Sequence, residues 1–272
     1  MSIAELTVEG TRLIEVFQEK ETDIEDAVAA AIATLGYPGK TFYIDSIAGD
    51  DTATGADSSH PFETLAHALD IIGGTAANGW NGLNAELVLA ADGAYTLPTK
   101  ELSLSGCFVR FYTYEPRSAG TPTITQPNGA INSSGDLPGF YLRNSVVNVI
   151  GAKLVTATTL PDPVRHHEMF RLRSSGGMGA LQMFTASAEI NDAPLMGTVT
   201  GLAQLGISQS TITRPTSSVP VLNMRTGGCA VLQVESATVP SADWRDDLIA
   251  GIVADAADVP INVLSNLDLT TP

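Results

Sequence analysis

The stretch at residues 41–72 reads TFYIDSIAGDDTATGADSSHPFETLAHALDII, and it joins three short patterns. Its first five residues are mostly aromatic or β-branched, which favours a strand. Gly, Asp, Ser and Thr then dominate up to His60, which predicts a polar turn. From Pro61 the spacing changes to that of a helix, because Pro suits a first helical turn and apolar residues recur three or four positions apart. The apolar face of this predicted helix consists of Phe62, Leu65, Leu69 and Ile72.

After this stretch, residues 85–272 hold about ten short runs rich in β-forming residues, separated by Gly, Pro, Asn, Asp or Ser. A β-sandwich would join such runs by hairpins, but only Asp92-Gly93 and Asn128-Gly129 offer the favoured turn pair here. A β-solenoid stacks coils of roughly 20 to 30 residues and accepts irregular loops. We therefore expect a mainly β protein built as a right-handed parallel β-helix, with residues 41–84 as its capping segment and 85–272 as the helix itself.

Before this stretch, residues 11–35 carry a helical pattern with an apolar stripe. Its members are Ile14, Phe17, Ile24, Val28, Ala31 and Leu35. Gly36 and Pro38 supply a stop, whereas Glu21 interrupts the heptad seam. The pattern predicts a docking or oligomerisation helix within residues 1–40, and a helix packed on its own domain is the alternative.

The strand, the Asp/Gly-rich turn and the Pro-Phe-Glu-Thr helix of residues 41–72 resemble the entry segment of pectate-lyase-like β-helices, which recurs in bacteriophage tail spikes. An acidic helix ahead of a β-helix also resembles tail fibres. The resemblance implies a virion tail fibre or tail spike protein that is made in the host cytoplasm, docks on the baseplate with other tail proteins, forms a homotrimer and binds a host receptor or surface glycan. The helix at 61–72 would then cover the open end of the first coil, which would otherwise expose a strand edge.

Charge and composition exclude several other classes of function. The net charge is −16 and the pI is near 4.4, which disfavours nucleic-acid binding because phosphate contacts need clustered Lys and Arg. Only 16% of residues are charged, against about 25% in an average soluble protein. Neither a secretory signal nor an apolar run of membrane-spanning length is present, so we expect no membrane insertion. Cys107 and Cys229 are predicted to be buried thiols, with a disulfide as the alternative.

Candidate chemistry rests on two acidic segments. Asp162, His166 and Glu168 lie in the run DPVRHHE and are weak catalytic candidates, since glycoside hydrolysis needs two carboxyl groups and a lyase could use a His base. A polysaccharide depolymerase on the same fold is therefore the alternative function, although a solvated loop projecting between coils is the favoured explanation of the run. Asp50 and Asp51, with neighbouring acids, could gather around Ca²⁺, or could simply shape the turn. Nucleophile and phosphate-binding motifs are absent, and no cofactor is expected.

Overall fold

The computed structural model divides the chain into two compact units, residues 1–38 and 39–272. In the first unit only Lys20 is described, so the predicted oligomerisation residues of the N-terminal helix lie outside the described part. In the second unit the structure describes residues 40–73, 80–82, 84–129, 131, 135–162, 166–172, 177–215, 218–225, 228–241, 243–267 and 269.

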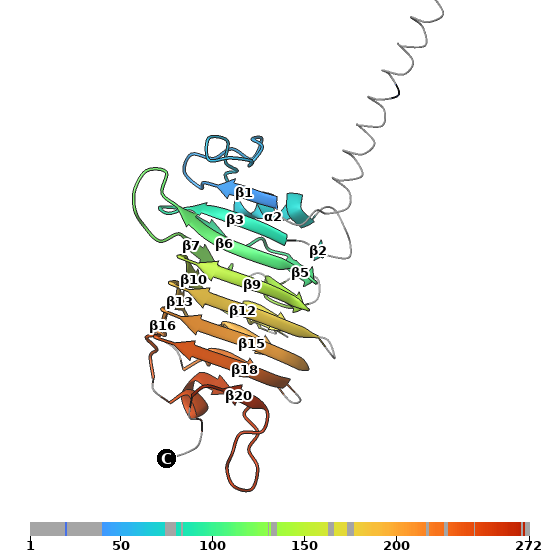
Figure 1. The fold of residues 1–272 in the computed structure, drawn as a ribbon, viewed down its shortest axis with the longest axis vertical. Coiled ribbons are helices and arrows are strands. Elements are labelled where there is room, and N and C mark those ends of the chain that lie inside the picture. The colour runs from blue at the N-terminus through green and yellow to red at the C-terminus, as the bar shows by residue number, and fades with distance from the viewer. Residues whose placement is uncertain are drawn as a thin grey trace, which may run out of the picture. The chain divides into compact units, whose positions relative to one another are not determined.

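The second unit is mainly β and contains three parallel sheets (Figure 1). Sheet A has eight strands in the order β1 (Lys40–Ile44), β3 (Asn84–Ala90), β6 (Phe108–Tyr114), β9 (Ser145–Ile150), β12 (Met178–Phe184), β15 (Gly201–Ser208), β18 (Gly228–Glu235) and β20 (Val263–Ser265). Sheet B has seven, in the order β2 (Trp80–Asn81), β5 (Glu101–Ser105), β8 (Gly139–Arg143), β11 (Phe170–Leu172), β14 (Met196–Thr198), β17 (Leu222–Met224) and β19 (Ile249–Ala250). Sheet C has five, in the order β4 (Ala94–Thr96), β7 (Thr123–Thr125), β10 (Lys153–Val155), β13 (Ser187–Glu189) and β16 (Thr211–Thr213).

The chain passes through the sheets in a constant order from β3 to β17: sheet A, then C, then B, then A again. Asn84 pairs with Phe108, 24 positions further on, whereas Phe108 pairs with Val146, 38 positions further on. The extra residues lie in the connections, because the strands themselves stay short. Since all three sheets are parallel, the β-sandwich alternative, which needs antiparallel hairpins, is excluded.

One continuous hydrophobic core lies among the sheets and follows from the alternation of side chains along each strand. In β3, for example, the side chains of Ala85, Leu87 and Leu89 are buried. Aromatic rings from neighbouring strands meet in the core. Phe140 stacks on Phe170 with ring centroids 5.2 Å apart, and it forms an edge-type contact with Phe111, with ring centroids 6.0 Å apart and planes at 71°.

The capping segment differs from its prediction at the start of the helix. Helix α2 spans Leu65–Gly73 and does not begin at Pro61. Thr64 accepts the His67 N–H at its hydroxyl, which caps the helix one residue before Leu65. Asp51 accepts the backbone N–H groups of Glu63 and Thr64. The carbonyl groups of Pro61 and Phe62 accept the N–H groups of Asp50 and Asp45, which keeps these two residues out of the helix.

Phe62 therefore reaches the core from an extended segment that bridges β1 at Ile44. Leu65 and Leu69 are buried in the same core, and the side chain of Ile72 lies outside the described part. The loop before Phe62 also covers the outer edge of β1: Tyr43 N–H donates to Gly55 O at 2.9 Å, and Asp45 N–H donates to Phe62 O at 2.8 Å. The N-terminal edge of sheet A is thus closed by the chain itself.

Candidate functional site

The outer face of sheet A is the broadest ordered surface that the strands build. Because the strands are parallel and in register, outward side chains line up in columns across the sheet. The central one, which we call the polar column, consists of Thr41, Glu86, Arg110, Asn148, Gln182 and Gln233, with Gly206 between the last two. With strands about 4.8 Å apart, the column is on the order of 30 Å long.

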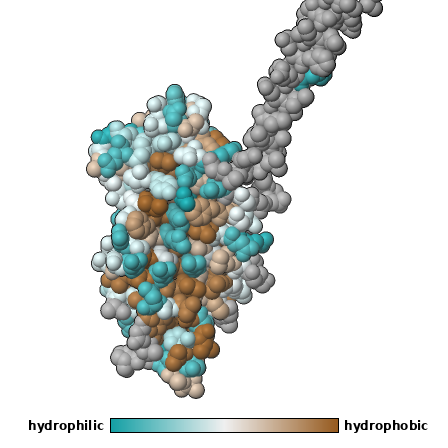
Figure 2. All heavy atoms as spheres, in the orientation of Figure 1, coloured by the Kyte–Doolittle hydropathy of each residue, from teal (hydrophilic) through white to brown (hydrophobic). Residues whose placement is uncertain are grey.

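Two largely apolar columns flank the polar column. The aromatic column lies two positions further along each strand. It contains Tyr43, Val88 and Tyr112 of β1, β3 and β6 and Ile150 and Phe184 of β9 and β12, and it ends on Ser208 and Glu235. The aliphatic column follows two positions earlier and contains Phe108, Val146, Ala180, Val231 and Leu264, with Gln204 among them. Figure 2 shows this face, with hydrophobic groups on either side of a hydrophilic line. Phe184 and Leu264 are 45% and 70% exposed, so the face is open to solvent.

The charges of the polar column cancel locally. Arg110 Nη1 lies 3.1 Å from Glu86 Oε1, and the Arg110 guanidinium also lies over the Phe108 ring, 4.5 Å from its centroid. The following members, Asn148 and Gln182, carry uncharged amides. Asn148 Oδ1 is shielded from solvent and accepts no hydrogen bond from the described residues. The face therefore combines amide hydrogen-bonding groups with flat apolar surface and has little net charge.

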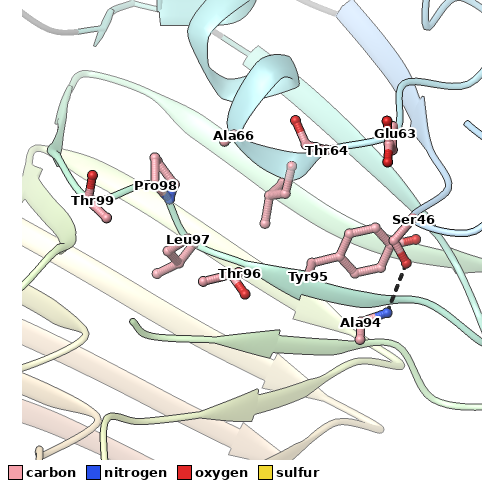
Figure 3. Close-up of a pocket in the computed structure, with 11 residues that line it drawn as sticks. Ser46, Glu63, Thr64, Ala66, Ala94, Tyr95, Thr96, Leu97, Pro98 and Thr99 are labelled. Carbon is pink, nitrogen blue, oxygen red and sulfur yellow. Dashed lines mark hydrogen bonds between the residues drawn. The ribbon is translucent and has the colours of Figure 1, made fainter. Parts of the chain in front are cut away.

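A smaller pocket of about 360 Å³ lies between the start of α2 and strand β4, lined among others by Ser46, Thr64 and Tyr95 (Figure 3). Its polar groups are largely engaged by the fold. Tyr95 Oη donates to Ile44 O at 2.9 Å and accepts the Ala90 N–H at 3.0 Å, and Ser46 Oγ accepts the Ala94 N–H at 3.0 Å. Burial raises the pKa of Tyr95, which removes the phenol as an acid or base near neutral pH.

The predicted catalytic residues do not form one open carboxyl pair. Asp162 is exposed and His166 is half-buried, whereas Glu168 is buried against sheet B. Glu168 Oε1 accepts from Asn223 Nδ2 at 3.3 Å and from Arg225 Nη2 at 3.4 Å.

Gly197 leaves the space that the Glu168 side chain fills, since a Cβ at this position would lie 2.4 Å from Glu168 Cγ. Asn223 and Arg225 are more than 50 positions away in the sequence, and no local pattern connects them to Glu168. Glu168 therefore belongs to the packing around the neighbouring strands β14 and β17 of sheet B.

The candidate calcium ligands are occupied by turn hydrogen bonds. Asp50 accepts from the backbone and the hydroxyl of Thr52, both at 2.8 Å, and these bonds lower the pKa of Asp50. Asp51 binds the start of α2, as described above. Within the described ranges, no group of three His, Cys, Asp or Glu side chains is placed to hold a metal ion.

The two cysteines differ in exposure. Cys107 is buried, as predicted, but Cys229 is exposed, which corrects its prediction as a buried thiol. The reason is parity along β18: Ala230 and Leu232 point into the core, so Cys229 points outward, beside Leu202 of β15.

No protein-family model matches the chain, and no curated protein sequence matches it. Among the described helices, none is long and apolar enough to cross a membrane.

Proposed function

We propose that the second unit is a right-handed parallel β-helix. The constant order in which the chain visits the three parallel sheets supports this, as does the core that they share. The right hand is the one that nearly all parallel crossover connections adopt. The long connections then correspond to loops inserted between coils, which solenoids accept readily.

We further propose that the protein is a structural, receptor-binding component of a bacteriophage tail, a tail fibre or tail spike attached to the baseplate. The single observation that carries the binding role is the outer face of sheet A. Aromatic faces suit the apolar faces of sugar rings, and side-chain amides suit their hydroxyl groups. Because this face has little net charge and the whole chain is acidic, an uncharged stretch of bacterial surface glycan fits it better than a polyanion.

Binding to bacterial surface polysaccharides tests this role. The full chain is added to immobilised neutral and acidic polysaccharides, and Tyr112→Ala and Gln182→Ala are compared with the parent protein. Each variant should weaken binding to the neutral glycan by about tenfold, the size of one lost stacking or hydrogen-bonding contact in a good site. Tyr141→Ala is the matched control, because Tyr141 is an outward, half-buried tyrosine on sheet B. Equal losses for Tyr112→Ala and Tyr141→Ala would contradict the assignment.

The proposed homotrimer and the alternative depolymerase activity need separate measurements. Light scattering should give about three times the chain mass of 28.4 kDa, and a stable monomer would contradict the trimer. Incubation with the bound glycan should release no oligosaccharide if the protein only binds. Release of oligosaccharide by the parent chain would establish the depolymerase instead.

A further inference from the structure

The two edge strands of sheet A differ in whether another segment covers their outer edge. At the N-terminal end, the loop that precedes Phe62 covers the edge of β1 with hydrogen bonds, as described above. At the other end, β20 is the last described strand of the sheet, and among the described strands its one partner is β18. The core beneath it is closed by Trp244, Leu248 and Leu269, which are buried, but these side chains do not pair with the strand edge.

The free edge of β20 is set by the alternation of its backbone groups. Ala230 N–H donates to Asn262 O at 2.9 Å, and Asn266 N–H donates to Leu232 O at 3.4 Å. In a parallel ladder, alternate residues of a strand bond to the same neighbour. Residues 262, 264 and 266 therefore face β18, and the N–H and C=O groups of Val263 and Ser265 face outward. An edge of this kind is a template for another strand.

Exposed apolar side chains gather at the same end. Four of the nine large hydrophobic residues that are exposed within the described ranges lie between positions 253 and 264. Their exposed fractions are 51% for Val253, 44% for Val259, 65% for Ile261 and 70% for Leu264. Val253 and Ile261 are neighbours, since Ile261 N–H donates to Val253 O at 2.8 Å. Figure 1 shows their loop projecting just beyond β20.

The net charge around β20 indicates which kind of partner could bind its edge. Residues 226–272 contain seven acids and one base, Arg245. Arg245 is bound to Asp258, and Arg214 to Asp247, which leaves the end strongly negative. Two copies meeting through this end would bring like charges together, which costs free energy. A basic partner would instead be attracted to these acids, which favours its binding.

We propose that the edge of β20 binds an extended segment of a partner protein by strand addition, and that this segment has alternating apolar side chains flanked by Lys or Arg. The outward groups of Val263 and Ser265 supply the backbone hydrogen bonds. The exposed apolar residues at 253–264 receive the side chains, and the acids of this end receive the basic flanks. This binding site adjoins the outer face of sheet A, with which it shares Leu264, but its hydrogen bonds come from the strand edge and not from that face.

A short synthetic peptide of alternating Val and Thr, with two Lys at each end, is the probe. Its binding to the full chain is measured by fluorescence anisotropy. Ser265→Pro and Ser265→Ala both remove the hydroxyl, but only the proline removes the outward N–H, at an edge position that tolerates it. We expect Ser265→Pro to weaken binding about tenfold relative to Ser265→Ala, the effect of one backbone hydrogen bond. Thermal melts by circular dichroism check that both variants remain folded.

A second variant and a second peptide keep the test independent of the proline. Leu264→Thr retains a β-forming residue at an exposed position, and it should weaken binding severalfold through lost apolar contact. A peptide with Glu in place of Lys should bind at least tenfold more weakly at low salt. Equal binding by Ser265→Pro and Ser265→Ala, equal binding of the two peptides, or no binding of the Lys peptide to the parent chain would each overturn the proposal. So would a self-association of the chain that Ser265→Pro abolishes and Ser265→Ala does not, because the occupant would then be a second copy.

Discussion

Replacing Phe140 by Ala tests whether the aromatic stack holds the neighbouring strands β8 and β11 together. Phe140 is fully buried, stacks on Phe170 at 5.2 Å and meets Phe111 at 6.0 Å. Truncating a buried Phe to Ala costs about 3–5 kcal/mol, and each aromatic pair adds about 0.5–1.5 kcal/mol beyond the buried area. Both rings would lose a neighbour, so we expect a loss of stability in the upper part of this range, about 4–5 kcal/mol.

The control is Phe184→Ala, the same substitution on the outer face of sheet A. Phe184 is 45% exposed, so about half of the free energy of a fully buried side chain is at stake, roughly 1 kcal/mol. Urea unfolding followed by Trp fluorescence gives both values, with the slopes compared to confirm that the same transition is observed. A loss for Phe140→Ala that is equal to the loss for Phe184→Ala, or below about 1 kcal/mol, would refute the stacked core.

Two further substitutions test the N-terminal end. Asp45 is buried and accepts both Nη groups of Arg117; although burial alone would raise its pKa, these bonds and two backbone N–H groups lower it. The stability that this ion pair contributes is present above the ordinary pKa of about 4 and is lost as the pH falls through the lowered pKa of Asp45. Arg117→Gln should therefore cost about 2 kcal/mol at pH 7 and should flatten the decline of the urea midpoint below pH 4. An unchanged dependence of the urea midpoint on pH would count against the pair. Gly55→Ala should cost at least about 2 kcal/mol more than Gly129→Ala. Both glycines have a φ of 64°, but of the two only Gly55 would place its new Cβ against a ring, 2.2 Å from that of Phe62. Equal melting temperatures for the two variants would show that the segment around Gly55 packs more loosely than described.

The sequence alone was sufficient where neighbouring residues carry the information. The strand at 40–44, the polar turn and the buried Leu65 and Leu69 all follow from local composition and from a spacing of three or four residues. The β-rich runs after residue 85 predicted a mainly β chain, because period-two alternation marks a strand with one buried face. The start of α2 was misplaced because the carbonyl groups of Pro61 and Phe62 accept the N–H groups of Asp50 and Asp45, far upstream, and so cannot accept from a first helical turn.

Only the tertiary structure decided which distant residues share a surface. Glu86 and Arg110 pair because their strands are neighbours in sheet A, and Glu168 reaches Asn223 because Gly197 lies between them. The lengths of the connections set this register, and those lengths vary too much for a period to be read from the chain. Local propensity determined that each short run would be a strand, since a strand needs only its own few residues. The columns of sheet A and the outer edge of β20 arise from the pairing of strands that lie far apart in the sequence, which no single segment specifies.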